Sequence, residues 1–369
     1  FDFVFISRCS NDCARILLIY CHMISLRFDF FLMRTIFYHI IQKNTKKSFG
    51  VSAIYDILMW YGGRKMKIVN LDAYTIHLDD LHWTDLAKLG DLTTYDRIAQ
   101  EDVIDAIGTA EVALFTSKVK ITREIMDACP NLKFISVTAT GYDNIDIAAA
   151  KEKGIAVCNV PAYSTESVAQ HTFALILEVA DNVGLYTRLV HEHRWENSQD
   201  YAFIEKPILQ LSGRSLGIVG YGTIGKRVAE IAKAFGMTVN IYSRDPEAAV
   251  KSDILTLHCP ATPENKGFVN SEFISRMKDG AILINTARGA LLNEEDVAAA
   301  LKSGKIAAAA VDVVNGEPPR KGHPFIGLKN LYVTPHIAWS AKEAREVICK
   351  TSAANLKSFL EGGTLNRIV

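Results

Sequence analysis

One stretch constrains the fold of this chain more than any other, the sequence Gly-Tyr-Gly-Thr-Ile-Gly at positions 220–225. An apolar run at 216–219 precedes it and predicts a buried parallel strand. A helical pattern follows over 226–235, and a second apolar strand follows over 237–242. In such a unit the three glycines allow a tight turn, a close backbone approach and close packing of helix against strand. This pattern is typical of a dinucleotide-binding turn, in which free N–H groups at the helix start face a pyrophosphate.

Short apolar strands alternate with helical patterns from Met66 onward, which is typical of a parallel α/β sheet. In a first unit we expect strands at 66–71, 111–115, 133–137 and 156–159, and helices at 101–107, 122–128 and 146–153. Between the two units we expect a helix capped by Ser164 or Thr165 that ends near Val183, and then a polar stretch to about Gln210. Around and after the glycine turn, further strands are expected at 254–258, 281–285, 307–313 and 331–334, and helices at 271–277, 293–303 and 341–360.

The connection after the strand at 237–242 is short. Only about nine residues, 244–252, precede the next expected strand. Fully extended they span roughly 30 Å, enough to cross the sheet but not to include the third strand of a mononucleotide-binding half. We therefore expect this strand to be missing.

Composition excludes several classes of function. Lys and Arg together number 41, as do Asp and Glu, and no basic block is interleaved with aromatic residues, so we expect no nucleic-acid partner. No apolar run reaches about 18 residues without a charge, so no membrane span is expected. The seven cysteines are scattered without paired CxxC motifs, which predicts no metal site and favours a reducing, cytoplasmic compartment.

Residues 1–65 differ from the rest of the chain, because they are rich in aromatic side chains and poor in acids. The apolar run 16–41 has no steady helical or strand period. A secretory signal does not fit, because no clean apolar region leads to a small-residue cleavage site, whereas a basic organelle presequence stays open. Our preferred hypothesis is a non-family extension, disordered or translated from upstream sequence, with Met66 as the true start.

Four further motifs accompany the glycine turn in a fixed order. They are Ala-Thr-Gly-Tyr-Asp-Asn-Ile-Asp at 139–146, Asn-Thr-Ala-Arg-Gly at 285–289, Val-Asp-Val-Val-Asn-Gly-Glu-Pro at 311–318 and Thr-Pro-His at 334–336. Together they make residues 66–369 resemble the D-isomer-specific 2-hydroxyacid dehydrogenase family. Trp339, in Pro-His-Ile-Ala-Trp, is similar to the glycerate dehydrogenase and hydroxypyruvate reductase branch.

The resemblance implies two Rossmann-like, doubly wound parallel-sheet domains with a cleft between them. Residues 66–164 and 341–369 would form a flavodoxin-like substrate domain. Residues 165–340 would form the NAD(P)-binding Rossmann domain. It also suggests a homodimer formed through the cofactor domain, with the long helix after Thr165 as a contributor.

Reduction of a 2-keto acid needs a proton for the carbonyl oxygen and a cation for the substrate's negative charge, besides the hydride of the nicotinamide. His336 follows an expected strand and is the candidate proton donor, since imidazole titrates near neutral pH. Glu317 would orient its ring. Arg288 would grip carboxylate and carbonyl oxygens with its guanidinium fork. The alternatives are a histidine packed at a strand end and ordinary surface charges.

The resemblance also implies binding residues. Thr140 and Gly141 would offer backbone N–H groups to the substrate carboxylate, together with Arg288. Asp312, an acid at the end of an apolar strand, would meet the nicotinamide carboxamide. The expected cofactor-binding positions are Thr172, Gly220, Gly222, Thr223, Ile224, Gly225, Ser243, Arg244, Cys259, Pro260, Thr286, Ala287, Arg288, Asp312, His336 and Ala338. Cys259 is not implied to be a nucleophile.

The choice of cofactor depends on the end of the strand at 237–242, where the fingerprint expects an acid that binds the ribose. The family usually has Asp where this chain has Ser243. Arg244 could partner a 2′-phosphate and Asp245 a 2′-hydroxyl. We expect NAD(H), with NADP(H) as the alternative.

The leading hypothesis is thus an oxidoreductase that moves a hydride between NAD(P)H and a small 2-keto acid, with hydroxypyruvate/D-glycerate or glyoxylate/glycolate favoured. A second class stays open, a sensor or corepressor-like protein that binds NAD(H) with little turnover. A third alternative is a protein damaged at the adenine side of its pocket by the missing strand.

Overall fold

The computed structural model describes residues 65–78 and 80–369, and Met66–Val369 forms one unit. The hypotheses on residues 1–65, including the apolar run 16–41, fall outside the described residues except for Lys65.

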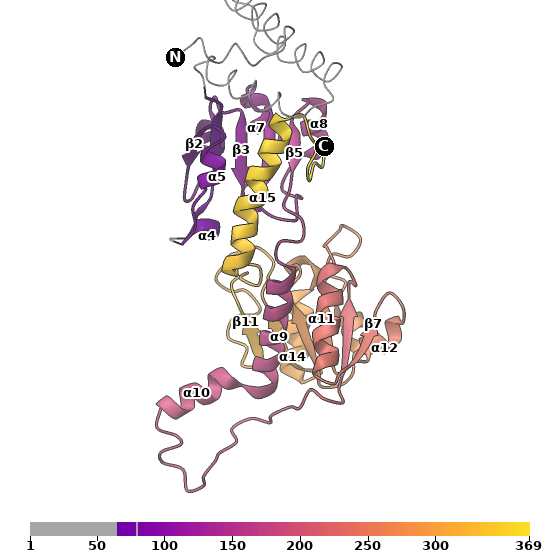
Figure 1. Ribbon diagram of the computed structural model, residues 1–369. Helices are drawn as coiled ribbons and strands as arrows, with labels where there is room; N and C mark the ends of the chain where they lie inside the picture. Colours follow the sequence, from indigo (N-terminus) through magenta and orange to yellow (C-terminus); the bar gives the residue numbers. More distant parts are fainter. Residues whose placement is uncertain (1–64, 79) are drawn as a thin grey trace, which may run out of the picture. The chain divides into compact units, whose positions relative to one another are not determined.

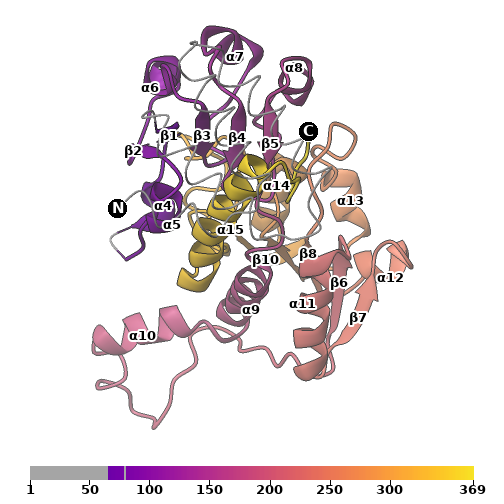
Figure 2. The ribbon, with the colours of Figure 1, turned by 45° about the horizontal axis from the view of Figure 1, so that its top comes forward.

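The first sheet has five parallel strands in the order β2-β1-β3-β4-β5. Figure 1 labels β2, β3 and β5, and Figure 2 also labels β1 and β4. The strands are β1 (Lys67–Asn70), β2 (Asp91–Thr94), β3 (Val112–Phe115), β4 (Phe134–Val137) and β5 (Ala156–Cys158). This is the 2-1-3-4-5 order of flavodoxin-like folds, so that expectation is confirmed. Every residue of β3 and β4 is buried, as expected for apolar strands of a parallel sheet that is covered on both faces.

Helices cover both faces of this sheet. Its helices are α4 (Tyr74–His77), α5 (Thr84–Ala87), η2 (Gln100–Asp102), α6 (Val103–Ile107), α7 (Arg123–Ala128) and α8 (Ile147–Glu152). Side chains of α6, α7 and α8 share one hydrophobic core with the strands. The C-terminal helix α15 (Lys342–Leu360) packs on β4, where the rings of Phe134 and Phe359 lie 5.0 Å apart. The backbone after α15 then bonds to β5 through Val157 and Ile368.

The second sheet has six parallel strands in the order β11-β10-β9-β8-β6-β7. They are β6 (Ser215–Val219), β7 (Thr238–Ile241), β8 (Ile254–Leu257), β9 (Ala281–Asn285), β10 (Ile306–Val311) and β11 (Leu331–Val333). The strand order reverses between β6 and β8, which is the point where open α/β sheets bind their ligands. The predicted Rossmann-like architecture is therefore confirmed.

The third strand of the mononucleotide-binding half is absent among the described residues. The sheet ends at β7, and the chain passes from β7 to β8 through the short helix α12 (Pro246–Val250). The prediction of a missing strand is confirmed, although the connection is a helix and not an extended segment.

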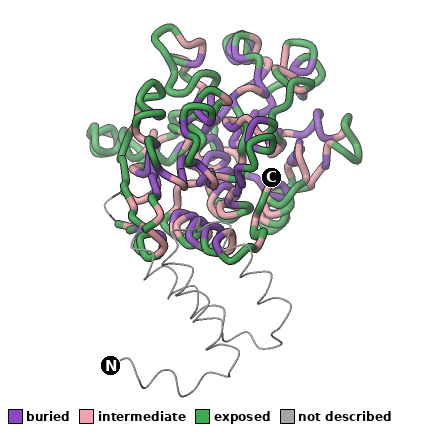
Figure 3. Tube along the Cα trace, turned by 90° about the horizontal axis from the view of Figure 1, so that it is seen from above, coloured by how far each residue is buried: buried purple, intermediate pink, exposed green. Residues whose placement is uncertain are grey.

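Helices also cover the second sheet on both faces. They are α9 (Thr165–Asp181), α11 (Thr223–Ala234), α12, α13 (Ser271–Arg276), η3 (Gly289–Leu291) and α14 (Glu294–Ser303). The helix α10 (Val183–His191) instead extends away from the sheet (Figure 2). One core joins α13 and α14 to the strands, and a second core joins α9 and α11 to the opposite face. Figure 3 shows the buried residues gathered inside and the exposed residues on the outer helices and loops.

Several local predictions were wrong. Strand β2 was missed because its sequence, Asp-Leu-Thr-Thr, is polar and lies at an exposed edge. The helices α4, α5 and α10 were also missed, and α10 lies within the stretch that we expected to be a polar connection (Figure 2). Ser164 occupies the N-cap position of α9, but its side chain caps no N–H group, and the hydroxyl of Thr165 donates to the carbonyl of Ala162.

Among the residues that the structure describes, none of the helices combines the length and the hydrophobicity needed to cross a bilayer.

Candidate functional site

The turns after four parallel strands bring the candidate residues to one edge of the second sheet. Gly220 follows β6, Cys259 lies after β8, Thr286 follows β9 and Asp312 follows β10. The carboxyl ends of parallel strands face the same way, so these turns share one rim.

His336 and Glu317 form a close pair. The Nδ1 atom of His336 lies 2.5 Å from Oε2 of Glu317, and their side chains are 36% and 34% exposed. The other carboxylate oxygen, Oε1, accepts the backbone N–H of Val314 at 3.0 Å. Burial raises the pKa of Glu317, but the bond and charge of His336 and the Val314 N–H outweigh it, so this pKa lies below its usual value. Because a carboxylate only accepts, Nδ1 carries a proton and Nε2 is the atom left for a substrate.

Asp312 lies beneath this pair and is only 1% exposed. Its carboxylate accepts the hydroxyl of Thr334 at 2.6 Å and the N–H groups of Ile337 and Ala338 at 2.9 and 2.8 Å. Burial alone would raise the pKa of Asp312, but its hydrogen bonds, the one with His171 foremost, hold the pKa below its usual value. The carboxylate is therefore a charged anchor for the segment that carries His336. The predicted contact of Asp312 with a nicotinamide stays a prediction.

Arg288 lies on the turn after β9, and Asn285 shapes that turn. The amide of Asn285 accepts the N–H of Ala287 at 3.0 Å and donates to the carbonyl of Arg288 at 2.9 Å. Arg288 itself is exposed, and its guanidinium donates to the carbonyl of Ala287 at 2.8 Å. Within residues 65–78 and 80–369 it forms no ion pair with a carboxylate. An exposed cation of this kind can bind an anionic ligand.

The turns of the two sheets meet at Arg288. A Cβ on Gly141 would lie 2.9 Å from Nη2 of Arg288, so the guanidinium rests directly against the backbone of the 139–146 motif. Next to Gly141, the hydroxyl of Thr140 donates to the carbonyl of Val160 at 3.0 Å. The structure thus brings Thr140, Gly141 and Arg288 together, and their binding of a substrate carboxylate stays a prediction.

The glycine turn after β6 has the shape that a pyrophosphate requires. Gly220 has φ 96°, and a Cβ there would lie 2.5 Å from the backbone N of Cys259. A Cβ on Gly225 would lie 2.1 Å from the carbonyl oxygen of Gly220, so only glycine fits at either position. Gly222 has open space where a Cβ would lie and is the N-cap residue of α11, so no side chain caps this helix. The free N–H groups at the start of α11, including those of Thr223 and Ile224, therefore fit a dinucleotide phosphate.

The other predicted cofactor residues lie around this rim. The hydroxyls of Thr172 and Thr286 are 3.0 Å apart, which joins α9 to the turn after β9. Ala338 is buried, whereas Pro260 is exposed. Burial raises the pKa of the Cys259 thiol, which suits a lining residue and not a nucleophile.

The end of β7 differs from a typical NAD site. Ser243 and Arg244 are exposed, and the guanidinium carbon of Arg244 lies 5.3 Å from the ring centre of Tyr221. Asp245 caps α12, because its carboxylate accepts the N–H of Ala248 at 3.0 Å. One carboxylate oxygen of Asp245, Oδ1, is thus engaged at the start of the helix.

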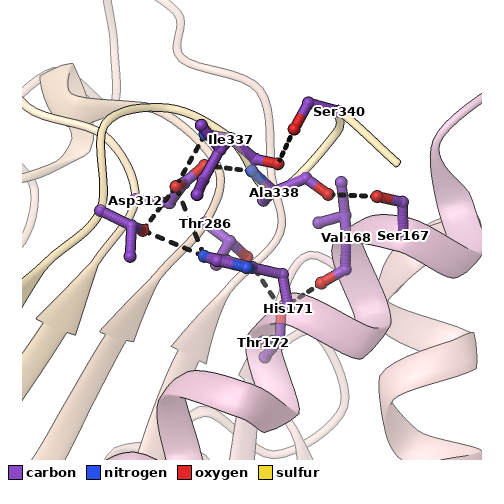
Figure 4. Close-up of polar contacts among 10 residues, drawn as sticks. Ser167, Val168, His171, Thr172, Thr286, Asp312, Ile337, Ala338 and Ser340 are labelled. Carbon is purple, nitrogen blue, oxygen red and sulfur yellow. Dashed lines mark hydrogen bonds and ion pairs between the residues drawn. The ribbon is translucent and has the colours of Figure 1, made fainter. Parts of the chain in front are cut away.

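No role for His171 was predicted from the sequence, and Thr334 was predicted only as part of the Thr-Pro-His motif. The Nε2 atom of His171 lies 3.0 Å from the Thr334 hydroxyl. It also lies 3.5 Å from the carboxylate of Asp312, which Figure 4 shows beside the His171 ring. The signal in the sequence was the polar run Gln-His-Thr at 170–172, inside an otherwise apolar helix.

Comparison with known proteins agrees with this geometry. Residues 173–338 match the model for "D-isomer specific 2-hydroxyacid dehydrogenase, NAD binding domain". The chain is 43% identical to a hydroxypyruvate reductase of Blautia hydrogenotrophica over 319 residues, which cover 82% of this chain and 99% of that protein. It is 37% identical to a glycerate dehydrogenase of Methylorubrum extorquens over 276 residues, or 72% of this chain and 88% of the relative.

A solved structure has the same fold. The D-lactate dehydrogenase of Aquifex aeolicus, in complex with NAD and lactic acid, superimposes with a TM-score of 0.68 at 30% identity. The match covers 80% of this chain and 96% of that one.

Proposed function

The chain belongs to the D-isomer-specific 2-hydroxyacid dehydrogenase family, and we propose that within it the protein interconverts hydroxypyruvate and D-glycerate. It is thus an oxidoreductase that acts on the CH–OH group with NAD(P). Glyoxylate and glycolate are the second substrate pair that we propose. The names of the two relatives and Trp339 of this chain support hydroxypyruvate as the first choice.

The His336–Glu317 pair is the observation that carries the proposal. Glu317 fixes Nδ1 of His336, so Nε2 is available to give a proton to the substrate carbonyl oxygen. The carboxylate also stabilises the imidazolium before the proton leaves. In the reverse direction Nε2 takes the hydroxyl proton of the 2-hydroxy acid. Both side chains are accessible enough to exchange this proton with solvent afterwards.

Arg288 would bind the substrate carboxylate and carbonyl oxygen with its guanidinium fork. The backbone N–H groups of Thr140 and Gly141 would bind the same carboxylate from the other side, since Gly141 lies against Arg288. These contacts would orient the keto carbon, and the charge of Arg288 would polarise its carbonyl group. When bound, NAD(P)H supplies the hydride for this carbon.

We assign residues 66–164 and 341–369 to the substrate domain, because both segments belong to the layers of the first sheet. Residues 165–340 form the cofactor domain in this proposal. The glycine turn would hold the pyrophosphate. The residues that would line the rest of the cofactor are Thr172, Ser243, Arg244, Cys259, Pro260, Thr286, Ala287, Asp312 and Ala338.

The end of β7 supports the use of NADPH beside NADH. One oxygen of the Asp245 carboxylate is engaged as the cap of α12, which leaves only the other oxygen for a ribose 2′-hydroxyl. Arg244 is exposed and lies over Tyr221, where its charge could meet a 2′-phosphate.

A homodimer is supported by the segment 183–210, which extends away from the second sheet (Figure 2). It exposes large apolar side chains, Trp195, Tyr201, Ile204 and Ile208, of which Tyr201 is 95% exposed. Exposed apolar side chains of this kind support a protein–protein contact at this segment. The four cysteines of the described residues are free thiols, in keeping with the cytoplasmic location that we propose.

Oxidation of NADH with hydroxypyruvate, glyoxylate and pyruvate tests the function. The purified protein should turn over hydroxypyruvate with the highest kcat/KM, and His336→Ala should lose this activity. A protein that binds NADH tightly without turnover would be a sensor, and the proposal would be wrong.

A further inference from the structure

We infer that His171 is a positioning residue for catalysis, because its ring N–H, through Thr334 and Asp312, holds the loop that presents His336. This inference rests on the proposed function, in which His336 moves the proton. His171 itself touches neither Glu317 nor the reacting atoms in this scheme.

The loop from Thr334 to Ala338 has a backbone that must be held in place. His336 has φ 55°, in the left-handed region that is strained for a residue other than glycine. Its N–H donates to the carbonyl of Asp312 at 2.8 Å. Contacts outside the loop therefore maintain a conformation that the loop would not prefer on its own.

The Asp312 carboxylate supplies most of these contacts. One oxygen, Oδ1, accepts the Thr334 hydroxyl. It also accepts the N–H of Ile337, and the other oxygen accepts the N–H of Ala338 (Figure 4). The carboxylate thus grips the loop on both sides of His336. Because the carboxylate is buried, the loss of any of these N–H or O–H donors would leave part of its negative charge without a hydrogen-bond partner.

The protons of this network assign a donor role to His171. The Thr334 hydroxyl has a single proton, which it donates to Asp312 at 2.6 Å. Towards His171 the same oxygen can therefore only accept, so Nε2 of His171 must carry a proton. This N–H lies 3.0 Å from the Thr334 oxygen and 3.5 Å from Oδ1 of Asp312. The imidazole N–H orients the hydroxyl and also faces the carboxylate.

Helix α9, which carries His171, also contacts the other end of the same loop. Ser167, one turn earlier on the same helix face, donates to the carbonyl of Ala338 at 2.6 Å. Thr172, the next residue, bonds to Thr286. The helix therefore holds the loop at both ends, and His171 acts at the end where Thr334 enters it.

Without the His171 N–H, the Thr334 hydroxyl can rotate and Asp312 loses part of its compensation. The loop can then relax, and Nε2 of His336 moves away from the carbonyl oxygen that it must protonate. A displacement of about 1 Å can cost on the order of 100-fold in rate. Arg288, on a different turn, would still bind the substrate, so the loss should fall on kcat and not on KM.

Two substitutions at His171 separate this role from simple packing. His171→Leu keeps the bulk without the N–H, whereas His171→Gln places an amide N–H near the position of Nε2. We expect His171→Leu to lower kcat with hydroxypyruvate by about 10- to 100-fold, with KM within about twofold and the NADH affinity unchanged. His171→Gln should recover most of the lost rate.

A second variant tests the same hydrogen bonds without changing His171, so that a folding defect of the His171 variants cannot decide the result. Thr334→Val keeps the shape of the side chain without its hydroxyl, so it should produce the same loss of kcat. In His171→Leu/Thr334→Val the two losses should not add, because both changes break one relay. Additive losses, equal rates for the Leu and Gln variants, or a changed KM at unchanged kcat would overturn the role of His171. If the wild-type protein reduces no 2-keto acid, the proposed function fails first and independently of these variants.

Discussion

The two ends of the proposed cofactor site are built very differently. Beside the nicotinamide end, the loop 334–338 is held by the buried Asp312, by its own backbone and by two side chains of α9. At the adenosine end, the sheet stops at β7, Ser243 and Arg244 are exposed, and a five-residue helix replaces a whole strand unit.

The difference indicates which part of the machinery needs the more exact geometry. Proton transfer depends on sub-ångström placement of one nitrogen, so many contacts define one loop. Affinity for the adenosine half comes from contacts that add up loosely, and a site can lose some of them and still bind through the pyrophosphate. We expect substitutions at the first end to lower kcat and substitutions at the second end to raise the cofactor KM.

His336→Ala should have the largest effect. It removes the group that protonates the carbonyl oxygen, and kcat for hydroxypyruvate should fall by about 10²- to 10⁴-fold. Because the imidazole contributes little to the pyrophosphate end, the NADH dissociation constant measured by fluorescence titration should stay within a few-fold. If the variant keeps the wild-type rate, His336 is not the proton donor.

Arg288→Lys should come next. The charge is kept, but the ammonium group cannot make two parallel bonds to carboxylate and carbonyl oxygens. We expect kcat/KM for hydroxypyruvate to fall by about 100-fold, since each lost charge-assisted bond accounts for roughly 1.5–3 kcal/mol. Steady-state kinetics at saturating NADH measure this change. A matched control is Arg276→Lys, on the outer helix α13, which should leave kcat/KM unchanged.

Asp312→Asn tests how firmly the nicotinamide end is anchored. An amide cannot accept bonds on both atoms, so the free energy of unfolding at pH 7 should fall by about 2–3 kcal/mol. The native pKa of Asp312 is lower than the unfolded value of about 3.9, so its stabilisation is complete above that pH and is lost as the pH falls through the native pKa. The difference between wild type and variant should therefore shrink below about pH 4.

Urea unfolding followed between pH 7 and pH 3.5 measures this difference. Asp91→Asn, at an exposed carboxylate of the edge strand β2 in the first sheet, is the control and should leave the midpoint at pH 7 unchanged. A difference for Asp312→Asn that stays constant across the range would contradict the charged anchor.

Arg244→Ala should have the smallest effect and should act only at the adenosine end. If Arg244 meets a 2′-phosphate, KM for NADPH should rise by about tenfold, whereas KM for NADH should change less than twofold and kcat should not change. Kinetics with each cofactor at saturating hydroxypyruvate separate these outcomes. Equal changes in both KM values would remove the proposed 2′-phosphate contact.

Much of the fold followed from local chemistry that a sequence displays. The apolar runs of β3, β4, β8 and β9 are typical of strands buried on both faces of a parallel sheet. The glycine pattern at 220–225 is typical of a dinucleotide-binding turn between a strand and a helix. The length of the connection 244–252 alone predicted the missing strand. By contrast, β2 is a polar edge strand that pairs with β1 only because the chain has already folded, so its sequence carries little signal.

The candidate site was predicted unevenly for a related reason. His336, Glu317 and Arg288 stand in motifs, and the structure pairs the first two directly and brings the third against Gly141. His171 stands more than 140 residues before Asp312, and its role depends on a contact between a helix and a strand end that no spacing reveals. Such supporting residues become visible only when the polar network is complete in three dimensions.

The most direct test of the account is a steady-state measurement of NADH oxidation at saturating hydroxypyruvate, with the NADH concentration varied. Because the loop that carries His336 is held by many contacts, we expect a kcat in the ordinary range, about 1 s⁻¹ or more. Because the sheet lacks a strand at the adenosine end, we expect a KM for NADH near the upper limit of about 1 mM seen in enzymes. A KM near 1 μM, or no turnover at millimolar NADH, would contradict it.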